Sequence, residues 1–111
     1  MTIADTPVAH DDLVVTCSHA NERAVVRVAG DLDAYTSIKL RRVLDDCLQL
    51  PVTSIECDLA GVTFIDSGGL GLLVSARRRA DSAHVRFGMV DPARCVQRLF
   101  DVTGMAERLL A

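Results

Sequence analysis

The fold of this chain is decided around the segment Val62–Gly71, which reads VTFIDSGGLG. An alternating apolar run at residues 55–59 precedes it and an amphipathic stretch at 67–82 includes its end, so it predicts a strand-to-helix junction. The first turns of the predicted helix contain three glycines, Gly68, Gly69 and Gly71. Glycine in a helix interior costs about 1 kcal/mol relative to alanine. We therefore expect these glycines to permit a close approach of backbone or of another molecule.

Strands and helices alternate outward from this junction. Periodicity predicts strands at residues 13–17, 24–28, 55–59 and 85–90, and helices at about 36–50, 67–82, 92–100 and 105–110. Asp91 and Pro92 have the residue types of a cap and a first position for the helix at 92–100. The short polar turn between the first two strands indicates an antiparallel hairpin, and the later alternation indicates parallel crossovers.

The outward positions of the predicted strands are polar or charged, namely Thr16, Arg27, Glu56, Asp58 and Arg86. A parallel sheet covered on both faces is apolar on both, so we expect one face of this sheet to be in contact with water. The predicted fold is α/β: a two-layer domain with a four-to-five-stranded mixed sheet, helices on one face, and the order β-β-α-β-α-β-α-α.

Length and composition exclude several classes of protein. A chain of 111 residues has room for one domain, which we place at 13–111 after a polar segment, 1–12, expected to be a flexible tail. A net charge of −3 and only four aromatic residues argue against nucleic-acid binding. No apolar run is long enough to span a bilayer and residues 1–12 lack a signal-peptide pattern, so we expect a cytoplasmic protein.

Ser67 stands where the helix at 67–82 begins, and its position has two compatible interpretations. It could be the N-cap, with its oxygen accepting a backbone N–H of the first turn. It could also be a phosphorylation site, because free N–H groups and the macrodipole at a helix N-terminus stabilise a phosphate. The neighbouring Asp66 would oppose the added charge.

Leu70 and Val74 lie one turn apart on a face of the helix adjoining its predicted core stripe, Gly69, Leu72, Leu73, Ala76 and Ala80. If uncovered, they would form a small apolar patch beside Ser67 of the kind that marks a partner surface. The alternative is that the apolar arc is wide and both are half-buried. Arg77, Arg78 and Arg79 follow and are expected to form a solvated helix end.

Enzymatic motifs are not found. A nucleophile elbow would need glycine where Ile65 stands, and no lysine follows the glycines as a P-loop requires. The histidines are scattered, at His10, His19 and His84, and the four cysteines include no C-x-x-C pair, so neither a catalytic pair nor a metal site is indicated. We expect a binding protein that is not an enzyme and that holds no cofactor.

Three motifs occur in order at element boundaries: Gly30-Asp-Leu-Asp-Ala-Tyr-Thr36, Phe64-Ile-Asp-Ser-Gly-Gly-Leu-Gly71 and Leu99-Phe-Asp-Val-Thr-Gly-Met105. In these motifs the chain resembles the STAS domain family, in particular the small bacterial anti-sigma-factor antagonists. The resemblance extends from about Leu13 to Leu110.

The resemblance implies partner switching. The unphosphorylated protein would bind an anti-sigma factor that is also a serine kinase of the histidine-kinase-like ATPase fold, and so free a sigma factor. The kinase would use its own ATP to phosphorylate Ser67, and a metal-dependent serine phosphatase would reset the protein. The residues expected at the partner surface, near Ser67 and the end of the second strand, are Asp31, Asp33, Asp66, Gly68, Gly69, Leu70 and Val74.

One departure from the family pattern keeps other interpretations open. Gly68 stands where the family usually has Ser or Thr, so the chain could be a binding module that is poorly phosphorylated. It could be a constitutive subunit of a lipid-transport complex or stress-sensing assembly in which Ser67 is only a helix cap. It could also be a cysteine-redox-gated antagonist, with a pair such as Cys17 and Cys57, both on predicted strands.

Overall fold

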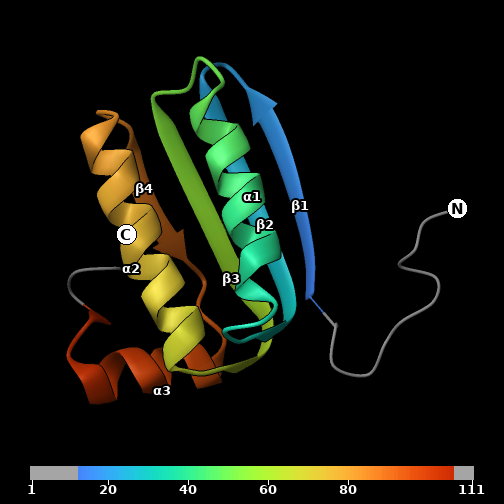
Figure 1. The fold of residues 1–111 in the computed structure, drawn as a ribbon, viewed down its shortest axis with the longest axis vertical. Coiled ribbons are helices and arrows are strands. Elements are labelled where there is room, and N and C mark those ends of the chain that lie inside the picture. Colours follow the sequence, from blue (N-terminus) through green and yellow to red (C-terminus); the bar gives the residue numbers. More distant parts are fainter. Residues whose placement is uncertain (1–12, 107–111) are drawn as a thin grey trace, which may run out of the picture.

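The computed structural model describes residues 13–106. The strands are β1 (Leu13–Ala20), β2 (Arg23–Leu32), β3 (Ser54–Ile65) and β4 (Arg86–Val90), and the helices are α1 (Ser37–Leu48), α2 (Ser67–Ser82) and α3 (Arg94–Thr103) (Figure 1). Their order matches the predicted α/β pattern up to the third helix. The predicted tail at 1–12 and most of the predicted helix at 105–110 lie outside the described residues.

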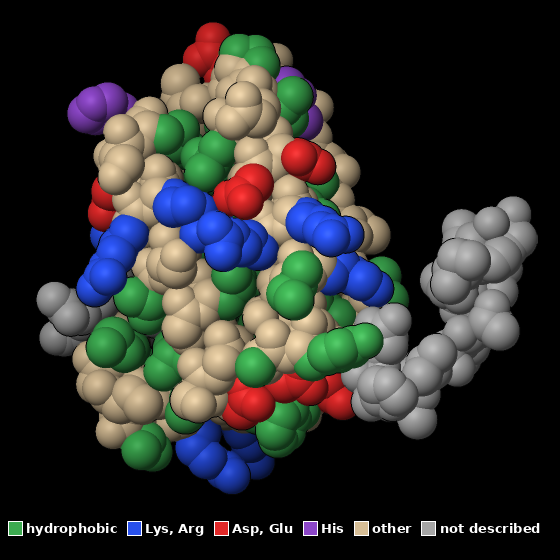
Figure 2. Space-filling model, in the orientation of Figure 1, with side chains coloured by type: hydrophobic (Ala, Val, Ile, Leu, Met, Phe, Trp, Pro, Cys, Tyr) green, Lys and Arg blue, Asp and Glu red, His purple; other side chains and the backbone are tan. Residues whose placement is uncertain are grey.

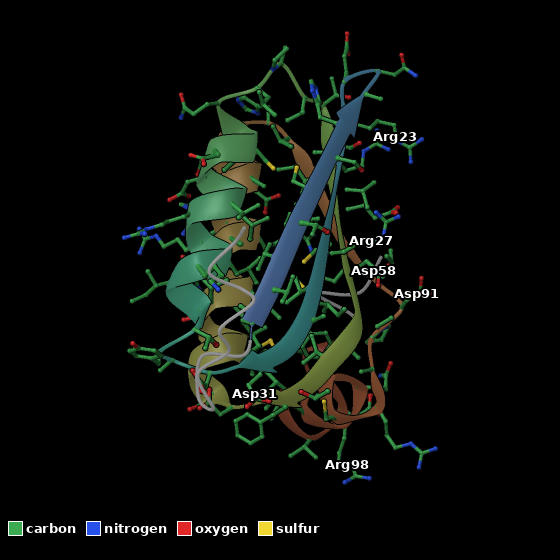
Figure 3. All side chains as sticks on the ribbon, turned by 90° about the vertical axis from the view of Figure 1, so that its right-hand side faces the viewer. Arg23, Arg27, Asp31, Asp58, Asp91 and Arg98 are labelled. Carbon is green, nitrogen blue, oxygen red and sulfur yellow. The ribbon has the colours of Figure 1, made fainter. Side chains whose placement is uncertain are left out.

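The four strands form one sheet in the order β1-β2-β3-β4. β1 and β2 are antiparallel, as the hairpin prediction requires, whereas β2–β3 and β3–β4 are parallel. Helices α1 and α2 lie side by side on one face, while α3 lies at the end of the sheet and packs against β3 (Figures 1 and 3). The opposite face is polar, with an ion pair between Arg27 and Asp58 at 3.8 Å (Figure 3).

A continuous hydrophobic core lies between the sheet and the helices. It takes Leu40, Leu44 and Cys47 from α1 and Leu73 and Ala76 from α2, all at most 2% exposed. This confirms the core stripe predicted for residues 67–82, except that Leu72 is only partly buried. The predicted solvated run at 77–79 needs a correction, because Arg79 is half-buried and its Nε lies 3.1 Å from Asp45 of α1.

Strands β2 and β3 are longer than predicted and end at the site of interest. The predicted boundaries were residues 28 and 59, whereas pairing continues to Leu32 and Ile65. Two register shifts, after Arg27 and after Gly30, interrupt the alternation of side chains, and such irregularities hide a strand from a period-two pattern. The segment before Asp66 is therefore a strand rather than a loop.

The predicted start of the third helix is wrong. Asp91 lies in the turn after β4 with a left-handed φ of 49°, and α3 begins at Arg94 after Ala93, which provides no side-chain cap. The N–H of Ala93 donates to the carbonyl of Leu59 at 3.2 Å, and this contact with β3 sets the start of the helix beyond Pro92. None of the helices between residues 13 and 106 is long and apolar enough to cross a membrane.

Candidate functional site

The predicted site residues come together at the edge of the sheet where β2 and β3 end. Leu32 pairs with Ile65 in the last register position, and the N–H of Asp66 donates to the Leu32 carbonyl at 3.3 Å. From these neighbouring strand ends the chain enters α1 and α2, so the N-termini of both helices lie at this edge (Figure 1). Acidic side chains gather at the same end, next to hydrophobic ones (Figure 2).

Asp66 is the N-cap of α2. Its backbone is extended, and Oδ1 accepts the N–H groups of Gly68 at 2.9 Å and Gly69 at 3.1 Å. The prediction that Ser67 caps the helix is therefore wrong. The strand conformation persists through Asp66, so Ser67 is already the first helical residue and the carboxylate before it occupies the first-turn donors.

Ser67 is left with an exposed side chain and no structural task that the described residues reveal. Within residues 13–106 its hydroxyl makes no hydrogen bond, because the donors that a capping serine would use are bound by Asp66. A hydroxyl at this position is accessible to a modifying enzyme and lies at the positive end of the helix dipole.

Asp33 organises the entry to α1 as Asp66 does for α2. Its Oδ1 accepts the N–H of Tyr35 at 2.9 Å and that of Thr36 at 2.8 Å. The backbone N–H of Thr36 is the main reason why the pKa of Asp33 is lower than usual, despite an opposing contribution from desolvation. The carboxylate of Asp33 is thus held ionised in a fixed turn.

Thr36 is a buried residue of this turn whose role the sequence did not indicate. Its hydroxyl donates to the carbonyl of Asp31 at 2.6 Å and accepts the N–H of Asp33 at 3.1 Å. The side chain is 3% exposed, so this small polar network fixes residues 31–36 as a rigid loop. A threonine three residues after an aspartate at a strand end is the signal that could have revealed it.

Asp31 is the first residue of this loop and still belongs to the last part of β2 (Figure 3). Its Oδ1 accepts the hydroxyl of Thr63 at 3.0 Å across the β2–β3 pair, and its register partner is Phe64. Asp31, Asp33 and Asp66 are therefore gathered at the edge that carries Ser67, as expected, although each also holds backbone or a neighbouring hydroxyl in place.

The glycines after Ser67 allow α2 to touch the loop at 31–36. A Cβ on Gly68 would lie 2.6 Å from Cβ and 2.8 Å from N of Ala34, and one on Gly69 would lie 2.3 Å from the Leu32 carbonyl oxygen. Neither position has room for a side chain. Gly68, which stands where the family pattern has Ser or Thr, thus allows a close contact between α2 and Ala34. Gly71 is different, because nothing lies within 4 Å of a Cβ placed there.

The apolar part of this surface is not the one predicted. Leu70 and Val74 are half-buried and pack against the core, so the wide-arc interpretation was correct. The exposed large apolar side chains at this end are instead Phe64 at 49%, Tyr35 at 66% and Ile38 at 55%. Because Ile65 faces inward, alternation along a longer β3 would have pointed to an outward Phe64.

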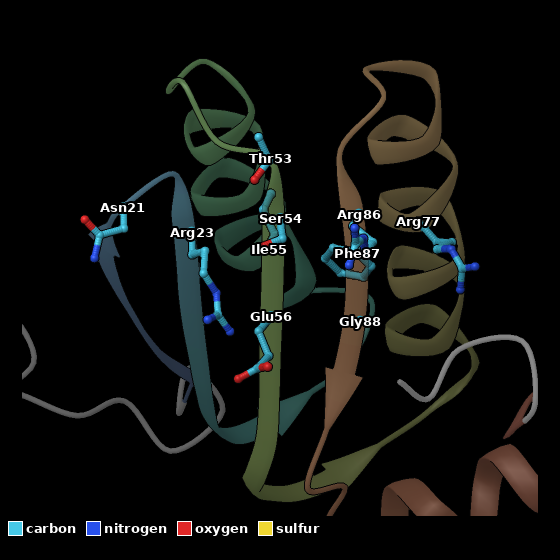
Figure 4. A pocket seen from close by; sticks show the side chains of 10 residues that line it. All are labelled: Asn21, Arg23, Thr53, Ser54, Ile55, Glu56, Arg77, Arg86, Phe87 and Gly88. Atoms are coloured by element: carbon cyan, nitrogen blue, oxygen red, sulfur yellow. The ribbon is translucent and has the colours of Figure 1, made fainter.

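One surface hollow lies away from this site. It has a volume of about 650 Å³ and lies near the starts of β2, β3 and β4, with Arg23, Glu56 and Arg86 among its lining residues (Figure 4). None of its lining residues belongs to the predicted site. Between residues 13 and 106, no group of three or more His, Cys, Asp or Glu side chains is placed to hold a metal ion.

A sequence model described as "Mlab, STAS domain" matches residues 15–111. The chain belongs to the STAS domain family. This STAS domain is 33% identical over 82 residues to an anti-sigma-B factor antagonist of Staphylococcus epidermidis, covering 74% of this chain and 76% of that protein. It is 36% identical over 83 residues to an anti-sigma-B factor antagonist of Listeria monocytogenes, covering 72% of this chain and 70% of that protein.

Solved structures of anti-sigma factor antagonists share its fold. An anti-sigma factor antagonist from Mycobacterium paratuberculosis matches with a TM-score of 0.80 and 23% identity, covering 91% of this chain and 86% of that one. The anti-sigma factor antagonist SpoIIAA in its unphosphorylated form matches with a TM-score of 0.74 and 22% identity, covering 87% of this chain and 86% of that one. The resemblance predicted from the three motifs is confirmed.

Proposed function

We propose that this STAS domain is an anti-sigma-factor antagonist that works by binding rather than by catalysis. Its unphosphorylated form binds an anti-sigma factor and so releases a sigma factor. The names of its curated relatives, at 33% and 36% identity over most of both chains, support this function. The surface that binds is the edge formed by the 31–36 loop and the first turns of α2.

In this proposal phosphorylation of Ser67 reverses binding. The observation that carries it is the accessible hydroxyl of Ser67 at the first position of α2, next to a cap that another residue already provides. Phosphate adds between −1.5 and −2 charges. At about 4 Å, two like charges repel by about 1 kcal/mol in water but by about 4 kcal/mol near a protein surface. A partner that excludes water from this acidic edge would therefore increase the electrostatic repulsion between the phosphate and the neighbouring carboxylates.

The partners follow from the same scheme. The anti-sigma factor is also the serine kinase and uses its own ATP, so this chain needs no cofactor, and a serine phosphatase restores the unmodified form. Asp31, Asp33 and Asp66 supply charge to the interface. Gly68 contributes partly accessible backbone, and Leu70 and Val74 contribute the accessible part of their half-buried side chains. Gly69 was also expected at this surface, but it is buried and packs against Leu32 instead. Exposed Tyr35 and Phe64 extend this surface with aromatic area, which favours protein partners.

The test compares four baits in a native lysate of the source bacterium: wild type, Ser67→Ala, Ser67→Asp and Ser82→Asp. Ser82 is exposed at the other end of α2, so its variant adds the same charge to the same helix. We expect wild type, Ser67→Ala and Ser82→Asp to capture an ATPase-fold kinase, and Ser67→Asp to lose it. Adding ATP should place one phosphate on wild type, mapped to Ser67, and none on Ser67→Ala.

A second candidate is a constitutive STAS subunit of a transport or stress-sensing assembly. One observation favours it: Gly68 stands where the family pattern has Ser or Thr after the phosphorylated serine. This candidate was first stated with Ser67 acting only as a helix cap. That part is wrong, because Asp66 is the N-cap of α2. Equal capture of the same partners by wild type and Ser67→Asp would favour this candidate over the switch.

A further inference from the structure

The thiols of Cys17 and Cys47 face each other across the layer boundary between sheet and helix. Cys17 lies on β1 and Cys47 near the end of α1, thirty residues apart in sequence, and their sulfur atoms are 3.2 Å apart. All four cysteines of the chain are free thiols. The contact is outside the site at Ser67, because Cys47 lies ten residues, or about 15 Å of helix, beyond the start of α1.

The partner of Cys17 differs from the one that the sequence suggested. Cys17 and Cys57 are both register partners of Val26, so strand β2 separates them. Two strand spacings put their Cα atoms about 10 Å apart, beyond the limit of about 7 Å for a disulfide. Cys47 reaches Cys17 because α1 packs over the β1–β2 hairpin from the other layer.

We propose that Cys17 and Cys47 form a reversible disulfide when the chain reacts with a low-molecular-weight disulfide. The bond between the two cysteines links the edge strand β1 to α1. An S–S bond is about 2.05 Å long, so the two sulfur atoms need to approach by about 1.2 Å from their position as thiols. Small rotations of the two side chains supply this movement. The disulfide is a property of this fold that does not depend on phosphorylation of Ser67.

The surroundings of the two thiols set the order of the steps. Cys17 is exposed, whereas Cys47 is 2% exposed. Burial, together with the neighbouring Cys17 thiol, raises the pKa of Cys47 to about 12. The thiolate of Cys17 therefore attacks the small disulfide first, which forms a mixed disulfide and releases one small thiolate.

Cys47 completes the exchange. Its sulfur attacks the sulfur of Cys17 in the mixed disulfide, its proton passes to solvent or to the leaving sulfur, and a second small thiol departs. One external S–S bond is thus broken and one internal S–S bond formed, with two protein thiols oxidised and two small thiols produced. Because Cys47 must ionise, we expect the second step to be slow at neutral pH and to accelerate as the pH rises.

The test equilibrates the full chain at pH 8 with glutathione mixtures of increasing oxidised fraction, followed by acid quenching, alkylation and peptide mapping. Trypsin leaves Cys47 and Cys57 in one peptide, so cleavage after Glu56 is needed to separate them. We expect a Cys17–Cys47 cross-link, two remaining free thiols, and full return to four on reduction. The oxidised chain should also unfold at a higher urea concentration than the reduced chain.

The variants Cys17→Ser and Cys95→Ser make a matched pair. Cys17 is exposed, so Cys17→Ser should fold, yet it should form no intramolecular disulfide, whereas Cys95→Ser should oxidise like wild type. Four free thiols in the most oxidising mixture would overturn the proposal. So would a cross-link to Cys57 or Cys95, a dimer through Cys17, or a mixed disulfide at Cys17 that persists without resolution.

Discussion

Gly68→Ala is the substitution that most directly tests the packing of α2 against the loop before α1. The new Cβ would lie 2.6, 2.7 and 2.8 Å from the Cβ, Cα and N atoms of Ala34. None of these atoms belongs to a flexible side chain. The loop can yield only by straining the hydrogen bonds that Asp33 and Thr36 make within it.

Two opposing effects decide the magnitude. Replacing glycine by alanine in a helix gains up to about 1 kcal/mol, and less in the first turn. Forcing an extra methyl group into a packed contact costs about 1–3 kcal/mol. Because the obstructing atoms are the Cβ and backbone of Ala34, which cannot rotate away, we expect the steric cost to dominate and Gly68→Ala to lower the free energy of unfolding by about 1–2 kcal/mol.

Gly71→Ala is the matched control, with the same substitution one turn later in the same helix. Nothing lies within 4 Å of its added Cβ, so only helix propensity acts and stability should rise by about 0.5–1 kcal/mol. Urea denaturation followed by circular dichroism measures both variants. Opposite signs are expected, and shifts of the same sign and size would refute the close contact between Gly68 and Ala34.

Three further predictions concern the aspartates and a buried thiol. Asp66→Ala leaves the N–H groups of Gly68 and Gly69 without their cap and should cost about 1–2 kcal/mol in urea denaturation, whereas Asp66→Asn keeps an acceptor oxygen and should cost clearly less. The pKa of Asp33 is lowered on folding, so the ionised carboxylate stabilises the folded chain above its ordinary pKa of 3.8, and this stabilisation is lost as the pH falls through the lower folded value. In Asp33→Asn, the urea midpoint should therefore fall less steeply with pH in this acid range. A slope equal to that of wild type would contradict the lowered pKa of Asp33. Burial raises the pKa of Cys57 to about 12, so iodoacetamide at neutral pH should label exposed Cys17 and spare Cys57 in the folded chain, which peptide mapping would report; equal labelling would mean that Cys57 is not buried.

The sequence was sufficient for the fold because its periodicities are regular where the core needs them. Leu40, Leu44 and Cys47 recur at helical spacing, and all face the sheet. The strand ends were harder, because the register shifts after Arg27 and Gly30 break the two-residue alternation on which the prediction depended. An irregular strand is read as a loop when only one chain segment is considered at a time.

The sequence predicted that the acidic residues of the candidate site lie together near Ser67, and the structure brings them together, but the sequence did not indicate which residue caps α2. Asp66 and Ser67 are both good capping residues, so composition alone could not choose between them. The choice depends on how far β3 extends, and that depends on its pairing with β2. The Cys17–Cys47 contact likewise arises between layers, thirty residues apart, and no local pattern signals it.

A phosphate on Ser67 and the carboxylate of Asp66 would compete for the same donors, the N–H groups of Gly68 and Gly69. Both groups are anionic, and both are favoured at the positive end of α2. Because these donors are backbone groups, the lack of a side chain at position 68 removes none of them. Gly68 is thus compatible with a phosphate at Ser67. The effect of this glycine would fall on the contact with Ala34 and on recognition by the proposed kinase. We expect a Gly68→Ser variant to be phosphorylated faster by the proposed kinase, yet to be less stable in urea denaturation.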